Sequence, residues 1–394
     1  MTATTSIEWT EASWNPVRGC SVVSPGCTNC YAMKMAHRFS GKGGVYEGLT
    51  KLTKGGPVWT GKVSLHPELL DWPLHRRKPS RIFVNSMSDL FHEDVPDEFI
   101  DRVFAVMASA KKHTFQILTK RADRMKQYMQ RVADGAPAAG KRYEAALRED
   151  FERYKHEFRE GYSLPEPPTP ELRFIYDSAT RQEARPTTPD GTTLSCGFSG
   201  GEYHWRPWPL SNVWLGVSVE DQARADERIP LLLQTPAAVR WISAEPLIGP
   251  VTLRLRFPIT GPGSSQPAAP PSSRVWNTLT GYDGIEDHKG RGAGTGTPRL
   301  DWVVAGGESG PGARPLQLDW VRSLRDQCHD AGIPFFLKQL GRWPIATKDE
   351  GYPWAQLHDD DGAPIGEWGL DGKSRKGGDP AEWPQDLRIR EYPR

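Results

Sequence analysis

Three cysteines near the amino end have a type and spacing suited to metal chemistry. Cys20, Cys27 and Cys30 lie within eleven residues, in the pattern C-x6-C-x2-C. Pro25 and Gly26 favour a turn that lets the three thiols converge. A helical pattern follows Cys30, and the amino end of a helix favours thiolates and the sulfides of an anionic cluster. Three thiolates on one loop predict a [4Fe–4S] cluster that leaves one iron open for a substrate or cosubstrate.

Two other interpretations of this spacing stay open. One is structural zinc with His37 as the fourth ligand, because zinc sites commonly combine cysteine and histidine. The other is three reduced cysteines without a metal. A disulfide framework is disfavoured, because the cysteine total of five is odd and the amino end has no signal-peptide pattern. The two isolated cysteines carry less information, and Cys328 lies on an apolar helical stripe that predicts a core thiol.

The composition is that of an ordinary globular protein. The chain has 394 residues, of which 25% are charged and 37% hydrophobic, and its formal net charge is +1. This charge excludes a strongly cationic DNA-coating protein but not a local basic patch. The longest apolar runs are far shorter than the roughly 20 residues of a membrane span. We therefore expect a cytoplasmic protein with no membrane partner.

Strand-type and helix-type patterns alternate along the chain, and they predict the elements that position the cysteines. Six short runs of β-branched and aromatic residues predict strands buried on both faces, as in a parallel sheet. They cover residues 81–85, 115–119, 213–218, 239–243, 302–305 and 334–337. Amphipathic stripes between them predict helices after Pro96, around 125–132 and from Asp319 to Gly332, with Asp319 as the cap. This alternation predicts an α/β fold with a parallel sheet or barrel.

Two irregular stretches interrupt the alternation. Residues 133–209 contain a charged helical pattern and a Pro-rich segment, and residues 257–300 contain low-complexity sequence that cannot pack a core. Without them the chain approaches the roughly 250 residues of a βα barrel. We expect one domain over 1–346 with these two insertions, and a loop-rich extension over 347–394 packed on it.

Polar residues follow each predicted strand. Because the carboxyl ends of parallel strands meet on one face, we expect one shared polar site there, although polar residues also begin ordinary loops. The charged groups assigned to catalysis are Lys120, Glu220, Glu245 and Lys338. Those assigned to cofactor binding are Asn85, Ser88, Asp89, Ser218 and Glu308.

Several motifs resemble a known family. The segments IEWTEASWNPVRGC (7–20) and VSPGCTNCYA (23–32) resemble the opening of a phage- and prophage-associated family of radical-SAM-like proteins with a three-cysteine motif. Later segments resemble the same family in the same order: FVNSMSDLF (83–91), LTKR (118–121), LGVSVE (215–220), SAEPL (243–247), AGGESG (305–310) and FLKQ (336–339). The resemblance covers most of the chain outside the two insertions.

This resemblance implies a partial (βα) barrel of the radical SAM type with the cysteine loop near the first strand. In such enzymes the three cysteines bind a [4Fe–4S] cluster, and S-adenosylmethionine chelates the open iron through its amino and carboxylate groups. An electron from the cluster then cleaves the cosubstrate, and the resulting 5′-deoxyadenosyl radical abstracts hydrogen from the substrate. A reductant protein such as flavodoxin or ferredoxin is implied as a partner.

The chain departs from the usual radical SAM pattern in two places. The common spacing is C-x3-C-x2-C with an aromatic residue before the last cysteine, whereas here six residues separate the first pair and Asn29 precedes Cys30. A Gly-Gly-Glu segment usually follows the second strand and contacts the cosubstrate amino group, but here it occurs late and ends at Glu308. By strand order, Ser88 and Asp89 are better assigned to that amino group.

The substrate is not specified by these motifs. Basic residues cluster over 75–81 and 111–126, which suits phosphate contacts, although such clusters are often solvated helix faces. A nucleic acid or nucleotide is therefore one hypothesis for the substrate. The alternative function is a zinc-stabilised nucleic-acid-binding protein without redox activity.

Overall fold

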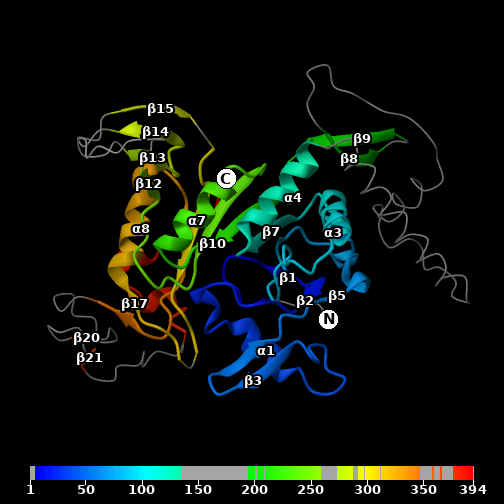
Figure 1. The fold of residues 1–394 in the computed structure, drawn as a ribbon, viewed down its shortest axis with the longest axis horizontal. Coiled ribbons are helices and arrows are strands. Elements are labelled where there is room, and N and C mark those ends of the chain that lie inside the picture. The colour runs from blue at the N-terminus through cyan, green and yellow to red at the C-terminus, as the bar shows by residue number, and fades with distance from the viewer. Residues whose placement is uncertain are drawn as a thin grey trace, which may run out of the picture. The chain divides into compact units, whose positions relative to one another are not determined.

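The computed structural model describes most of the chain outside the expected insertions and part of the tail. The described residues are 5–134, 194–199, 202–207, 209–258, 273–286, 292–296, 298–310, 312–346, 357–358, 364–365 and 376–393. They form the α/β architecture drawn in Figure 1. The charged helical pattern over 141–159 and most of the low-complexity sequence lie outside the described residues.

The main sheet has seven strands in the order β1-β6-β7-β10-β11-β16-β18. These strands are β1 (Ala12–Trp14), β6 (Arg81–Val84), β7 (Thr114–Thr119), β10 (Val213–Ser218), β11 (Val239–Ala244), β16 (Trp302–Gly306) and β18 (Phe335–Gln339). Spatial order follows chain order, as in a βα barrel, and β1 and β18 are the two edges. The predicted α/β fold of the partial-barrel class is confirmed.

The chain forms two compact units, and the cysteine segment is split between them after residue 23. Unit 1 comprises residues 1–23, 32–215 and 235–238, and unit 2 comprises 24–31, 216–234 and 239–394. Cys20 therefore belongs to unit 1, whereas Cys27 and Cys30 belong to unit 2.

Unit 1 contains the parallel strands β1, β6 and β7. Helix α3 (Asp97–Ser109) begins directly after Pro96 and buries Phe99, Val103 and Met107, the stripe predicted from sequence. Helix α4 (Ala122–Asp134) buries its apolar face too, and Tyr128 donates a 2.7 Å hydrogen bond to Asp101. These long apolar stripes explain why both helices pack onto a core.

A smaller group of elements flanks the cysteine segment along the chain. Helix α1 (Tyr31–Arg38) packs on the hairpin β3 (Thr50–Thr53) and β4 (Gly56–Trp59), since the Trp59 N–H lies 3.3 Å from Met33 Sδ. The short strands β2 (Val17–Arg18) and β5 (Ser64–Leu65) pair antiparallel, and α2 (Trp72–His75) precedes β6.

Unit 2 contains strands β11, β16 and β18, paired in parallel. Helix α7 (Gln222–Leu233) is capped by Asp221, whose carboxylate accepts from the Arg224 N–H at 2.9 Å. Helix α8 (Leu318–Ala331) ends at Gly332, as expected, with φ of 64°. Its amino-terminal cap is Gln317 and not Asp319, which lies within the first turn.

Antiparallel strands occupy parts of the expected insertions. Strands β8 (Leu194–Ser199) and β9 (Glu202–Pro207) form a hairpin. Strands β12 (Arg254–Pro258), β13 (Ser273–Asn277), β14 (Tyr282–Glu286) and β15 (Gly292–Gly296) form a four-stranded sheet.

The carboxyl-terminal residues follow the edge strand of unit 2. The Leu337 N–H donates to the Ile389 carbonyl at 2.9 Å, and Phe336 and Arg390 form an antiparallel bridge. Leu387 is buried there. Among the described helices, none combines the length and the apolar character needed to span a bilayer.

Candidate cysteine site

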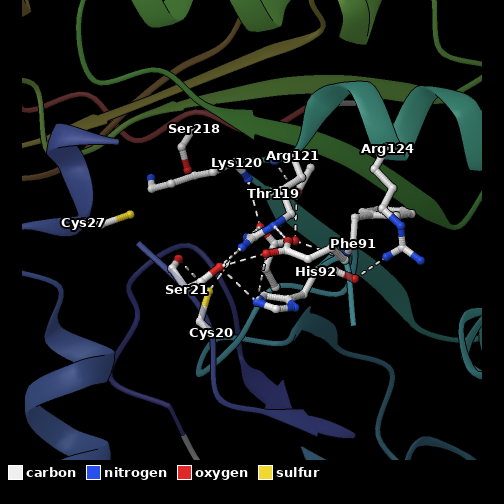
Figure 2. A network of polar contacts seen from close by, with 12 residues as sticks. Cys20, Ser21, Cys27, Phe91, His92, Thr119, Lys120, Arg121, Arg124 and Ser218 are labelled. Carbon is white, nitrogen blue, oxygen red and sulfur yellow. Dashed lines mark hydrogen bonds and ion pairs between the residues drawn. The ribbon is translucent and has the colours of Figure 1, made fainter. Parts of the chain in front are cut away.

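In unit 1, Arg121 connects Cys20 to a polar network. Arg121 follows β7 directly, and its guanidinium lies 3.9 Å from Cys20 Sγ and donates a 2.6 Å hydrogen bond to Ser21 Oγ. The same guanidinium pairs with Asp89 at 3.0 Å and with Glu93 at 2.8 Å. Figure 2 shows this side chain reaching toward Cys20 and Ser21 from the start of α4. A cation so placed favours the thiolate form of a neighbouring cysteine.

Charge pairing fixes the protonation of this network. Burial alone would lower the pKa of Arg121, but the negative charges of Asp89, a Cys20 thiolate and Glu93 outweigh it and raise that pKa. Partial burial would raise the pKa of Glu93, but hydrogen bonds and the Arg121 charge lower it to about 2. His92 accepts or donates a 3.0 Å hydrogen bond with Ser21, and burial together with Arg121 lowers its pKa.

Most of the site residues predicted in unit 1 meet at this network. Asp89 accepts from Thr119 at 2.7 Å and from the Lys120 backbone N–H at 3.1 Å. The Ser88 hydroxyl donates to the Val17 carbonyl at 2.8 Å, and Ser88 forms a parallel bridge with Gly19.

Asn85 takes a strained conformation at the end of β6. Its φ is 60°, a left-handed value that asparagine tolerates better than most residues, and its Oδ1 accepts from the Val17 N–H at 3.3 Å. Its own N–H donates to the Trp14 carbonyl at 2.8 Å. Asn85, Ser88 and Asp89 thus all adjoin the cysteine segment or the residue that contacts it.

In unit 2, Ser24 and Gly26 hold the Cys27 loop on Glu220. The loop turns through the short helix η1 (Pro25–Cys27), and the Ser24 hydroxyl donates a 2.8 Å hydrogen bond to Glu220 Oε1. A Cβ on Gly26 would overlap the Glu220 side chain. Only glycine therefore allows the loop to approach the carboxylate this closely.

Glu220 is itself paired inside the core. Its carboxylate lies 3.2 Å from Arg228 of α7, and both side chains are fully buried. Arg228 also donates to the Ser218 carbonyl at 2.9 Å. Removing one partner of such a pair leaves an uncompensated buried charge, which costs about 3–5 kcal/mol. The Cys27 loop is therefore hydrogen-bonded to Glu220, a carboxylate whose loss would leave Arg228 buried without a charged partner.

A second anchor holds the residue next to Cys30. The Asn29 side chain donates to Glu308 Oε2 at 2.9 Å and to the Gly312 carbonyl at 2.7 Å. Arg314 binds the same carboxylate through its guanidinium at 2.6 Å. Burial alone would raise the pKa of Glu308, but the hydrogen bonds and charge of Arg314 and the Asn29 bond outweigh it and lower that pKa.

The remaining predicted pair lies at two other strand ends of unit 2. Lys338 Nζ of β18 donates to Glu245 Oε1, which follows β11, at 2.6 Å. A Cβ on Gly306 of β16 would lie 3.5 Å from the Glu245 side chain, so the pair lies beside the Gly306–Glu308 segment. Both side chains are partly exposed, with 14% of Lys338 and 17% of Glu245 accessible.

The cysteines supply a donor set suited to an iron–sulfur cluster. Cys20, Cys27, Cys30 and Cys328 are in no disulfide, and Cys27 is buried while Cys20 and Cys30 are partly exposed. Across the described ranges, no group of three or more His, Cys, Asp or Glu side chains has metal-site geometry. The zinc alternative involves His37, whose Nδ1 lies 3.1 Å from the Thr50 hydroxyl. Metal binding by the cysteines thus stays a prediction.

Sequence reasoning missed the residues that hold the cysteine segment. They are Ser21, Ser24, Asn29, Arg121, Arg228 and Arg314. A signal existed for Arg228, because it stands in the buried stripe of α7 that includes Ala225 and Leu232. In the sequence, Asn29 stands out as a departure from a motif, and Arg121 belongs to the LTKR segment and to a basic cluster, but these patterns give neither residue a role at the site.

Comparison with known proteins gives a family for this chain. Residues 4–363 match the family described as "Protein of unknown function (DUF5131)", and the chain belongs to that family. No curated protein matches the sequence. A solved mutant of spore photoproduct lyase is similar over 52% of this chain and 71% of its own, with 12% identity and a TM-score of 0.20. At that TM-score the likeness carries no argument about this chain.

Proposed function

We propose that this protein is a radical S-adenosylmethionine enzyme in which Cys20, Cys27 and Cys30 bind a [4Fe–4S] cluster. The observation that carries the proposal is the anchoring of the segment bearing three reduced thiols. Arg121 contacts its first cysteine, and two carboxylates accept hydrogen bonds from residues beside the other two.

The donor set favours iron–sulfur over other metals. Thiolates are the usual ligands of such clusters, and three of them leave one iron for the amino and carboxylate groups of S-adenosylmethionine. When bound, the cluster supplies the electron that cleaves the sulfonium carbon–sulfur bond of this cosubstrate. The aligned parallel strands provide a face on which cosubstrate and substrate bind.

The residues of the chain divide into positioning and reacting groups under this proposal. Arg121 keeps Cys20 as a thiolate, while Glu220 and Glu308 hold the loop through Ser24 and Asn29. The oxygens of Glu220 are engaged by Ser24 and Arg228, so we propose that it positions the loop.

Glu245 and Lys338 remain the proposed catalytic pair. Lys338 Nζ and Glu245 Oε1 lie 2.6 Å apart and both side chains are partly exposed, so we propose that they contact the substrate together. Asn85, Ser88, Asp89 and Ser218 stay proposed cofactor contacts, and a nucleic acid or nucleotide stays the proposed substrate class.

The experiment is reductive cleavage of S-adenosylmethionine by the full chain. Protein purified anaerobically and supplied with iron and sulfide is mixed with S-adenosylmethionine and dithionite, and 5′-deoxyadenosine is measured by chromatography. We expect product from the wild type and from the matched control Cys196→Ser, and none from Cys27→Ser. A wild type that binds one zinc per chain and forms no 5′-deoxyadenosine contradicts the proposal and favours the zinc alternative.

A further inference from the structure

Helix α1 and the hairpin beside it expose apolar side chains. Met35 is 40% exposed, Phe39 54% and Leu52 70%, and Val45 is also exposed. Exposed basic side chains lie among them in the chain: Arg38, Lys42, Lys51 and Lys54. We call these eight residues the α1–β3 surface. They lie on helix α1, on strand β3 and in the turns next to these elements. Exposed apolar residues with charged neighbours are typical of interaction sites.

The α1–β3 surface stands on a packed base. Met33 lies under the helix against the Trp59 backbone, and His37 is hydrogen-bonded to Thr50 of β3 at 3.1 Å. The Tyr46 N–H donates to the Phe39 carbonyl at 3.3 Å, and Tyr46 itself is buried. Figure 1 shows α1 running next to this hairpin. Helix α1 buries Ala32, Met33 and Ala36, and it leaves Met35 exposed. The exposed apolar side chains therefore belong to a folded and packed part of the chain.

Positive charge is concentrated in the same part of the chain. Residues 31–56 contain five basic residues against one acidic residue, a net charge of +4 in a chain whose total is +1. The rest of the chain is therefore net negative. The one acid, Glu47, accepts a hydrogen bond from the Gly43 backbone at 2.7 Å. A surface with this charge attracts an acidic partner and speeds the encounter.

We propose that the α1–β3 surface docks an acidic flavoprotein that donates single electrons to the cluster. This inference rests on the proposed function, which requires an electron that the chain itself does not contain. Helix α1 begins at the residue after Cys30, so a protein docked on α1 stands next to a proposed cluster ligand. In each transfer the reduced flavin of the donor loses one electron and the cluster gains it.

The chemistry of the surface favours a protein over a nucleic acid. Three of its four apolar side chains, Met35, Val45 and Leu52, are aliphatic or thioether groups, and Phe39 is the one aromatic ring among the four. Single-stranded nucleic acids instead stack their bases on several aromatic rings. Small apolar patches with charged rims suit the weak, short-lived complexes of electron-transfer proteins.

The test compares two reductants on the same reconstituted full chain. The protein donor is an acidic flavodoxin kept reduced by its reductase and NADPH, and the chemical donor is dithionite, which needs no docking. The variants are the double substitutions Met35→Glu with Phe39→Glu, and Lys51→Glu with Lys54→Glu. The matched control is Arg254→Glu with Arg299→Glu, which equals the charge change of the lysine pair on exposed residues outside both basic clusters.

We expect both surface variants to lower the rate of cluster reduction by flavodoxin at least about tenfold, since steering and contact are both lost. Their reduction by dithionite, followed by electron paramagnetic resonance, stays at the wild-type rate, and the control matches the wild type with both donors. Flavodoxin binding measured by calorimetry weakens in parallel and falls as salt is raised.

Three results overturn this inference in different ways. Unchanged flavodoxin rates in both variants, with a cluster that dithionite reduces normally, reject the docking surface and leave the proposed function intact. A wild type that assembles no cluster rejects the proposed function and this inference together. Variants that lose affinity for an oligonucleotide while flavodoxin still reduces them normally assign the surface to nucleic acid instead.

Discussion

Arginines and carboxylates hold both halves of the cysteine segment, but the group that contacts the segment directly differs between the halves. In unit 1 an arginine contacts the cysteine, and the carboxylates of Asp89 and Glu93 stand behind it. In unit 2 the carboxylates of Glu220 and Glu308 contact the loop, and arginines stand behind them. The first arrangement acts on the charge of a thiol, and the second acts on the position of a backbone.

This difference assigns separate tasks to the two halves. Arg121 donates toward Cys20 Sγ, so its loss changes the thiolate content of that cysteine. Glu220 and Glu308 accept from Ser24 and Asn29, so their loss frees the loop that bears the other two thiols. Variants on each side should therefore differ in which property they change.

The largest effect is expected from Glu220→Ala. It leaves Arg228 buried without its carboxylate, so the free energy of unfolding should fall by about 3–5 kcal/mol, measured by urea denaturation. The control Glu227→Ala removes an exposed carboxylate of α7, the helix that carries Arg228, and it should cost less than about 1 kcal/mol. Equal losses in the two variants would show that the buried pair has no special role.

The next effect is expected from Arg121→Gln. The free energy of unfolding should fall by about 2–3 kcal/mol, because Asp89 loses a charged hydrogen bond in a largely buried site. Alkylation of Cys20 by iodoacetamide should slow severalfold relative to Cys30, which is also partly exposed, as followed by mass spectrometry. Arg124→Gln is the control, since Arg124 donates to the His92 and Val95 carbonyls. A Cys20 rate unchanged by Arg121→Gln would contradict the charge role.

A smaller effect is expected from Gly26→Ala. The added Cβ overlaps Glu220, whose side chain is pinned by Arg228, so overpacking should cost about 1–3 kcal/mol. Gly41→Ala is the matched control, because a Cβ there meets no atom within 4 Å. The comparison uses thermal unfolding, and a neutral Gly26→Ala would mean that the loop does not rest on the carboxylate.

The smallest effect is expected from Glu308→Gln, and it should depend on pH. The folded-state pKa of Glu308 is lowered, so its contribution is present above the unfolded carboxyl value of about 4.3 and is lost as pH falls through the folded value. The wild type should exceed the variant by about 1 kcal/mol at neutral pH, and the gap should close in acid. A gap independent of pH would argue against an ionised Glu308.

The sequence predicted the central elements well because their patterns are strong. All six predicted runs are strands, and the α3 stripe of Phe99, Val103 and Met107 is buried. Strand β1 was missed because three residues are too few for a periodic signal. The helix after Cys30 was predicted correctly, but its face with Met35 and Phe39 is exposed. A stripe shows that side chains share a face and not that another element covers it.

The site was predicted less completely because its anchors depend on long-range contacts. Asp89, Glu220 and Glu308 were predicted because they follow strands, and the carboxyl ends of parallel strands lie at one edge of a sheet. Their partners Ser24 and Asn29 lie far away in sequence, and no local pattern links Asn29 to a carboxylate 279 residues later. Only the folded chain brings these groups together.

The most direct test of the central claim is a measurement of iron and acid-labile sulfide in the full chain, combined with electron paramagnetic resonance of the reduced protein. The account predicts about four iron and four sulfide per chain, a reduced-cluster signal that changes when S-adenosylmethionine is added, and loss of both in Cys20→Ser. Stoichiometric zinc with no iron signal, or full iron content retained in Cys20→Ser, would contradict it.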